Sequence, residues 1–180
     1  MIFDPEKHHR RSVCLKEYNY SEPGTYFITI CSWLRGFIFG EIINGKMELN
    51  EYGMIAEQEW LNNVHVSPHI DSDKFIVMPN HIHGIMIINR RGVLQYAPAN
   101  DALQSPTQTI GSIVRGYIST TTRQVNIIRN TPGMPVWQRN YFEHLIRNEF
   151  ELNNIREYMR NNTLRWAFDK DNPLNIQIEP

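Results

Sequence analysis

The pattern of hydrophobic and polar positions changes along the chain between the two-residue period of a strand and the longer period of a helix. Segment 24–33, GTYFITICSW, alternates and is rich in aromatic and β-branched residues, which predicts a strand. Segment 36–50 holds an Asn-Gly pair between two short apolar runs, a pattern typical of a β-hairpin. Asn50 is a good N-cap for a helix over 51–64, where apolar residues recur at helical spacing. This part of the chain therefore predicts a strand, a hairpin and a helix.

The later segments predict two adjacent strands, a helix, a further strand and a last helix. Segments 69–78 and 81–89 are expected to be strands joined by a short turn, and the next helix is expected over about 109–127. Segment 134–148 is extended and leads into the last helix, with Asn148 as its N-cap and a glutamate three residues later. This order of elements predicts an α+β sandwich in which helices cover one face of an antiparallel sheet.

Length and composition are those of a single domain of ordinary size. The chain has 180 residues, of which 41% are hydrophobic, so residues 1–180 are expected to form one domain. Segment 90–109 has little periodic pattern and contains two prolines, which favours a mobile connection or a lid. The sequence has no apolar run of membrane-spanning length and no signal-peptide core, so we expect a cytoplasmic protein. Cys14 and Cys31 form no CxxC pair, which disfavours a structural zinc site.

The basic residues are unevenly distributed along the chain. Residues 1–89 carry 7 Lys and Arg against 11 Asp and Glu, whereas residues 111–165 carry 8 Arg against 4 Glu. Because arginine binds phosphate in a bidentate manner, the second segment is a candidate for phosphate contacts. Ordinary helix-surface charge explains the distribution equally well, and the net charge of −1 does not by itself indicate nucleic acid.

Two histidines lie one residue apart within an apolar strand, in the sequence VMPNHIHGIMI at 77–87. Residues two apart on a strand point to the same face, about 6–7 Å apart along the chain. His81 and His83 can therefore bind one metal ion from one side, while Ile82 enters the opposite layer. Two imidazoles held by hydrogen bonds would give the same pattern, so a metal site requires a third ligand.

The last predicted helix offers a third ligand. Its apolar stripe is Leu152, Ile155 and Met159, and a polar stripe of Asn154, Tyr158 and Asn162 runs beside it at intervals of four residues. Helix residues four apart lie close together on one face. A helix packed over the histidine-bearing strand would thus present a phenol and an amide oxygen together. Periodicity alone explains Tyr158 equally well as a boundary residue with a hydrated hydroxyl.

Together these motifs resemble the single-tyrosine HUH transposases, in particular the REP-associated tyrosine transposases and related insertion-sequence transposases. The resemblance is carried by VMPNHIHGIMII, by GTYFITICS upstream and by VWQRNYFEHLIRNEFELNNIREYMRNN downstream. It covers roughly residues 10–165, and the combination of a His-Ile-His strand, this WQRNYFEH segment and a tyrosine-bearing helix in this order is specific. Segment 90–109 matches nothing in the family pattern.

The resemblance implies a ferredoxin-like fold of the HUH endonuclease type and assigns roles to four residues. His81 and His83 would be metal ligands, Tyr158 the nucleophile and Asn162 the third ligand, with Mg²⁺ or Mn²⁺ as the metal. Many relatives have Asn-Pro after the nucleophile, whereas this chain has two consecutive asparagines followed by a threonine. Asn161 therefore competes with Asn162 for the metal.

The resemblance also implies a transposase that acts on single-stranded DNA at hairpins or palindromic repeats. Its tyrosine would form a 5′-phosphotyrosine and release a 3′-hydroxyl, and a homodimer is implied by the resemblance alone. Further DNA contacts are expected from Arg139, His144, Arg147 and Arg156, and from a basic arm at 7–11. Ordinary solvated positions are the alternative for each of these residues.

Other readings of the sequence stay open. Tyr141 is a second candidate nucleophile, although it lacks an amide four residues later. A domesticated HUH protein, which nicks hairpins without moving its own gene, would carry the same residues. A DNA-binding regulator would have no catalysis at all. A histidine-based hydrolase of small phosphoesters would need additional His or Asp ligands, for which the sequence gives no pattern.

Overall fold

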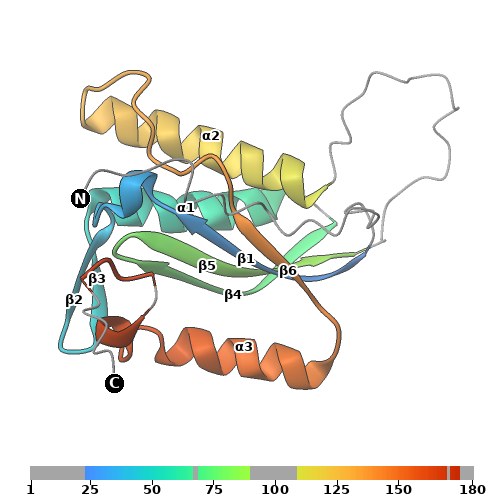
Figure 1. The fold of residues 1–180 in the computed structure, drawn as a ribbon. Helices are drawn as coiled ribbons and strands as arrows, with labels where there is room; N and C mark the ends of the chain where they lie inside the picture. Colours follow the sequence, from blue (N-terminus) through green and yellow to red (C-terminus); the bar gives the residue numbers. More distant parts are fainter. Residues whose placement is uncertain (1–22, 67–68, 90–108, 170, 175–180) are drawn as a thin grey trace, which may run out of the picture.

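A four-stranded antiparallel sheet forms the centre of the computed structural model, which describes residues 23–66, 69–89, 109–169 and 171–174 (Figure 1). The strands lie in the order β4-β5-β1-β6. Their bounds are Gly24–Cys31 for β1, Ile70–Met78 for β4, His81–Ile88 for β5 and Phe142–Ile146 for β6. The predicted basic arm at 7–11 and nearly all of the connection predicted at 90–109 lie outside the described residues.

The connections between these strands are those of a ferredoxin-like fold. Helix α1 (Glu51–Val66) lies between β1 and β4 in the chain, and helix α2 (Ile110–Ile128) lies between β5 and β6. Both helices pack on the same face of the sheet, where Trp60, Tyr117 and the even-numbered residues of β5 form the larger core (Figure 1). The predicted α+β class with a ferredoxin-like antiparallel sheet is therefore confirmed.

The prediction that the helices cover one face holds for α1 and α2 but is wrong for the last helix, α3 (Glu149–Asn161). Figure 1 shows α3 on the opposite side of the sheet. There Met159 packs with Phe27, Ile85 and Ile146 in a second, smaller core. The physical reason is that β1 and β5 are apolar on both faces, so each face must be covered to keep the strands out of water.

A short hairpin is inserted between β1 and α1. It consists of β2 (Gly40–Ile43) and β3 (Lys46–Leu49). The turn residues Asn44 and Gly45 have φ values of 51° and 75°, the left-handed conformation that a two-residue hairpin turn requires at both positions. The hairpin predicted from the Asn-Gly pair is confirmed.

Asparagine side chains begin both α1 and α3, as the sequence predicts. Asn50 accepts a hydrogen bond from the backbone N–H of Gly53, and Asn148 accepts one from the N–H of Glu151. The carboxylate of Glu151 turns to the backbone N–H of Arg147 rather than back to Asn148, so the predicted capping box at α3 is only half formed. No helix among the described residues has both the length and the apolar character to cross a membrane.

Gly84 allows Trp60 to pack directly on β5, and we expect Gly84→Ala to destabilise the fold. A Cβ atom at Gly84 would lie 2.3 Å from two ring carbons of Trp60, which is 1% exposed and has no room to retreat. Overpacking of this kind costs about 1–3 kcal/mol in the free energy of unfolding, measurable by urea denaturation. Gly116 in α2 is the matched control, because a Cβ there meets nothing closer than 3.9 Å and Ala stabilises a helix by up to about 1 kcal/mol. Equal stability of Gly84→Ala and the wild type would contradict this packing.

Candidate active site

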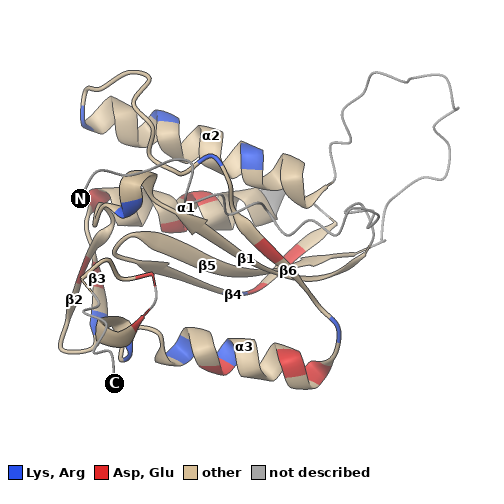
Figure 2. Ribbon diagram, viewed as in Figure 1, with Lys and Arg blue, Asp and Glu red and all other residues tan. Residues whose placement is uncertain are grey.

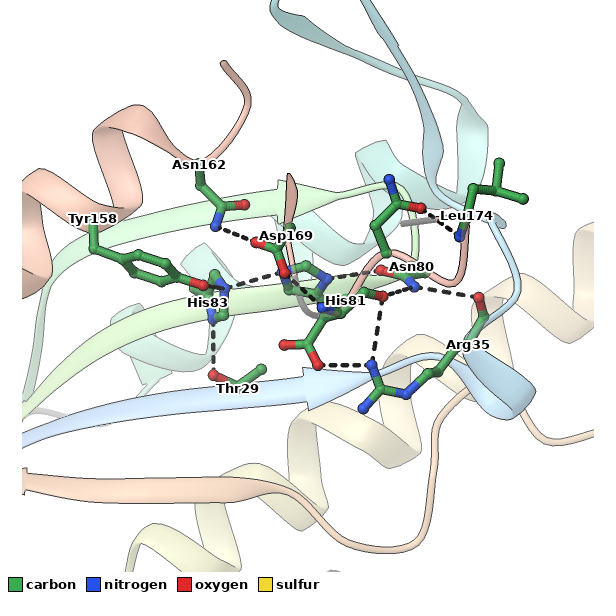
Figure 3. Close-up of polar contacts among 11 residues, drawn as sticks. Thr29, Arg35, Asn80, His81, His83, Tyr158, Asn162, Asp169 and Leu174 are labelled. Atoms are coloured by element: carbon green, nitrogen blue, oxygen red, sulfur yellow. Dashed lines mark hydrogen bonds and ion pairs between the residues drawn. The ribbon is translucent and has the colours of Figure 1, made fainter. Parts of the chain in front are cut away.

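The side chains of His81 and His83 point from β5 toward α3, while Ile82 between them enters the larger core (Figure 3). The Nε2 atoms of the two histidines face each other at 3.0 Å. Both rings are buried, with 0% and 2% of their residue surface exposed. The strand alternation thus brings the two imidazoles together as the sequence predicts.

Asn80 fixes the orientation of the His81 ring. The Asn80 amide nitrogen donates to the backbone carbonyls of Asp171 at 2.7 Å and of Arg35 at 3.3 Å. Its oxygen therefore faces Nδ1 of His81, at 2.8 Å. An amide oxygen can only accept, so the proton of neutral His81 lies on Nδ1 and Nε2 carries the lone pair.

His83 is held by β1, the neighbouring strand. Thr29 lies opposite His83 in the β1–β5 pairing, and its hydroxyl is 2.8 Å from His83 Nδ1. The Phe27 ring stacks on the His83 imidazole, with 5.2 Å between ring centroids. If His83 also carries its proton on Nδ1, two Nε2 lone pairs oppose each other at 3.0 Å, an arrangement that a cation or a shared proton relieves.

Helix α3 brings a phenol and an amide to the histidines. The apolar stripe that ends in Met159 packs on the sheet, which turns the adjacent polar stripe toward β5. The Tyr158 hydroxyl lies 3.2 Å from His83 Nε2. Asn162, at the end of the helix, is buried, and its amide nitrogen donates to Asp169 at 2.9 Å (Figure 3). Of the two candidate amides, Asn162 is the buried one, whereas Asn161 is half-buried.

These residues fit a divalent metal ion on two observations. Adjacent ligands on an octahedral ion at about 2.1 Å lie about 3.0 Å apart, which is the separation of the two imidazole Nε2 atoms. The Asn162 side-chain oxygen is buried and has no hydrogen-bond partner, which a bound cation would supply. Among the described residues no three His, Cys, Asp or Glu side chains form a metal-binding group, so a three-residue site here depends on the amide.

The environment of Tyr158 keeps its phenol protonated at neutral pH. Burial raises the pKa of Tyr158 above its ordinary value, and the negative charges of Asp169 and Asp171 raise it further, while a hydrogen bond from Asn162 opposes them. The residue is nevertheless 40% exposed. Compared with the predicted ligands His81, His83 and Asn162, all of which are buried, Tyr158 is therefore the residue that solvent reaches most readily.

Tyr141, the second candidate nucleophile, lies in the other layer. It is half-buried and packs against the larger core, on the side of the sheet that faces α1 and α2. The histidines point to the opposite side. The structure therefore does not bring Tyr141 together with the predicted ligands.

The predicted DNA-binding residues divide into two kinds. His144 pairs with Glu151 at 2.6 Å, and Arg156 pairs with Asp73 at 2.7 Å, so both already have an acidic partner. Arg139 and Arg147 are exposed. Figure 2 shows only basic charges on α2 but both signs on α3, so the arginine-rich stretch does not form one surface around the histidines.

Several residues that surround the site were not predicted from the sequence. Asp169 and Asp171 follow α3 in an irregular segment, and Arg35 binds Asp171 at 2.7 Å from the other side. Asn80 directly precedes His81 in the sequence and could have been suspected for that reason alone. The acidic residues carried no signal, because a loop has no periodicity that assigns its side chains to a face.

A pair of aromatic side chains lies next to His81. The Trp166 ring centroid is 5.9 Å from that of His81, and Phe37 packs edge-on against Trp166 at 5.7 Å. Phe37 is 42% exposed and Trp166 is half-buried. The group thus extends the buried histidines to an aromatic surface that is open to solvent.

Comparisons with known proteins find a relative in sequence and a likeness in fold. No family model matches the sequence. An uncharacterized protein of Haemophilus influenzae is 43% identical over 169 residues, which cover 91% of this chain and 93% of that protein. A REP-associated tyrosine transposase, whose structure was solved bound to a REP hairpin, aligns with a TM-score of 0.58 and 16% identity, over 85% of this chain and 74% of that one. At this identity the likeness concerns the fold alone.

Proposed function

We propose that this protein is a metal-dependent transposase for single-stranded DNA. The chain belongs to the same family as the Haemophilus influenzae protein, and it has the fold of a REP-associated tyrosine transposase. It would cut and rejoin DNA through a 5′-phosphotyrosine at hairpins or palindromic repeats. One observation carries the proposal: a phenol lies 3.2 Å from one of two paired imidazoles, beside a buried amide oxygen that has no partner.

Tyr158 acts as the nucleophile in this proposal. Its hydroxyl oxygen attacks the scissile phosphorus, a bond from tyrosine to the 5′-phosphate forms, and the bond from phosphorus to the 3′ oxygen breaks. The phenolic proton is lost and the released 3′ oxygen gains one, so a phosphodiester replaces a phosphodiester. Because no bond energy is dissipated, a 3′-hydroxyl can later reverse the step and join a new strand.

His81, His83 and Asn162 would hold a Mg²⁺ or Mn²⁺ ion. When bound, the ion would polarise the phosphate and stabilise the charge that develops on it. Asn80 and Thr29 keep both Nε2 atoms directed into the site, so the ligands need little rearrangement. The raised pKa of Tyr158 favours loss of its proton during the attack rather than before it.

The aromatic surface beside His81 suits single-stranded DNA, because unpaired bases stack on aromatic rings. The solved transposase was bound to a REP hairpin, and a hairpin flanked by unpaired nucleotides is the corresponding substrate here. Exposed Arg139 and Arg147 would contact phosphates, which makes binding weaken as salt rises.

Trp166→Ala should weaken binding of a hairpin with a single-stranded extension by about ten-fold or more, since one stacked base contributes about 1–3 kcal/mol. Fluorescence anisotropy with labelled DNA measures the effect. Phe150→Ala is the matched control, because this phenylalanine is 78% exposed in the first turn of α3, about 18 Å along the helix axis from Asn162. Equal losses in the two variants would refute the aromatic surface as a base-binding site.

The proposed activity is tested by incubating the protein with single-stranded fragments from the flanks of its own gene, in Mg²⁺ or Mn²⁺. We expect a protein–DNA product that survives denaturing electrophoresis and disappears with a chelator. Cleavage without transfer to a second strand would identify a domesticated nicking protein. DNA binding without any covalent product, across hairpins and both metals, would identify a regulator and reject the enzyme.

A further inference from the structure

We propose that Asp169 is a positioning residue, which fixes the Asn162 amide so that its oxygen, and not its nitrogen, faces the metal. The inference rests on the proposed function, because it concerns the same metal site. Asp169 lies seven residues after Asn162, in the segment that follows α3 (Figure 3). It is 7% exposed, so its carboxylate is part of the protein interior.

Both oxygens of the Asp169 carboxylate accept hydrogen bonds. Oδ1 accepts from the backbone N–H of Asp171 at 2.7 Å, and Oδ2 accepts from the side-chain nitrogen of Asn162 at 2.9 Å. An ionised carboxylate has acceptors only, so the amide must present its NH₂ group to it. The Asn162 oxygen is thereby forced to the other side, where it is buried and without a partner.

The segment around Asp169 is built to hold this carboxylate in place. The backbone N–H of Asp169 donates to the Trp166 carbonyl at 3.1 Å, and the Asn172 side chain donates to the same carbonyl at 2.9 Å. The N–H of Asn172 in turn donates to the Asp169 carbonyl at 3.0 Å. The short 3-10 turn η2 (Trp166–Phe168) and the residues after it therefore fix the backbone of Asp169, while the N–H of Asp171 holds its carboxylate.

Replacement of Asp169 by asparagine should reverse the Asn162 amide. An asparagine at this position keeps its oxygen on the Asp171 N–H, a backbone donor that cannot turn away, and points its own NH₂ at Asn162. Asn162 then accepts with its oxygen and directs its NH₂ to the histidines. A positively polarised NH₂ group cannot bind a cation, so one of three ligands is lost.

The double variant Asn162→Asp with Asp169→Asn exchanges the two partners and should repair the site. The new asparagine donates to one oxygen of the new aspartate, whose other oxygen faces the histidines. Asp171→Asn is the control for charge, because it removes a nearby negative charge while its side chain still accepts from Arg35 and its backbone N–H still reaches Asp169. Asn162→Leu removes the proposed ligand and leaves Asp169 in place.

The experiment is titration of each protein with Mn²⁺ alone, followed by electron paramagnetic resonance, with thermal unfolding to check the fold. Asp169→Asn and Asn162→Leu should each weaken Mn²⁺ binding by at least about ten-fold. The double variant should bind within about three-fold of the wild type or more tightly, and Asp171→Asn should change binding by less than about three-fold. This set of results supports the positioning role.

Three results overturn it. Equal weakening by Asp169→Asn and Asp171→Asn would mean that charge alone matters. Unchanged Mn²⁺ binding in Asn162→Leu would show that Asn162 is not a ligand, so Asp169 could not act by positioning it. Unchanged binding in Asp169→Asn, while His81→Ala loses Mn²⁺, would reject the positioning role and leave the proposed function standing. A wild-type protein that binds no Mn²⁺ at its histidines would reject the metal site of the proposed function together with the inference.

Discussion

Tyr158→Phe will lower the rate of covalent adduct formation with single-stranded DNA by at least about a thousand-fold, because the nucleophilic oxygen is removed and no other group replaces it. The ring remains in place, so its contact with Phe27, at 6.3 Å between centroids, is preserved. We therefore expect the fold, DNA binding and Mn²⁺ binding to stay close to those of the wild type. Denaturing electrophoresis with 3′-labelled DNA measures the adduct, since the tyrosine retains the 5′-phosphate of the downstream strand.

Tyr141→Phe is the matched control for this prediction. Tyr141 lies on the face of the sheet that carries α1 and α2, away from the histidines, and its substitution should leave adduct formation within about three-fold of the wild type. An adduct that persists in Tyr158→Phe but vanishes in Tyr141→Phe would assign the chemistry to the other face, and the site described above would not be the active site.

His81→Ala and His83→Ala will each abolish binding of the divalent cation and, with it, DNA cleavage. Each change removes one of three protein ligands, and it also leaves a polar group without its partner, the Asn80 oxygen or the Thr29 hydroxyl. We expect Mn²⁺ affinity to fall by about a hundred-fold or more, measured by isothermal titration calorimetry. A chelator added to the wild-type protein should stop cleavage to the same extent.

His69→Ala is the control histidine, since His69 precedes Ile70, which pairs with Ile88 at the opposite end of β5 from His81. Its metal affinity should equal that of the wild type. The contrary result is DNA cleavage that survives in both His81→Ala and His83→Ala, or that continues in excess chelator. Either outcome would mean that the paired imidazoles are only part of the protein interior and that cleavage takes place at another site.

The two halves of the site differ in how much of each could be predicted from the sequence. The sequence predicts that His81 and His83 lie together, because the two-residue period of a strand determines which side chains share a face. Tyr158 and Asn162 were grouped for the corresponding reason on a helix, and the packing of Met159 against the sheet turns that face toward the histidines. Regular periodicity was therefore enough to place four side chains relative to their own elements.

The supporting residues could not be predicted, because they belong to turns and to a segment without periodic pattern. Asp169 meets Asn162 only because the chain reverses after α3, and Asp171 meets Arg35 across a large separation in sequence. The sequence also does not predict on which face of the sheet α3 packs. Runs such as FITI and IMII do not show which face each helix will cover, since both faces of β1 and β5 are apolar.

The most direct test of the central claim is peptide mapping of the covalent protein–DNA product by mass spectrometry, after digestion with nuclease and trypsin. The account predicts a nucleotide mass on Tyr158, in the tryptic peptide that spans residues 157–160 and contains no other tyrosine. A nucleotide on the peptide that carries Tyr141, or no modified peptide from a protein shown to hold Mn²⁺ at its histidines, would contradict it.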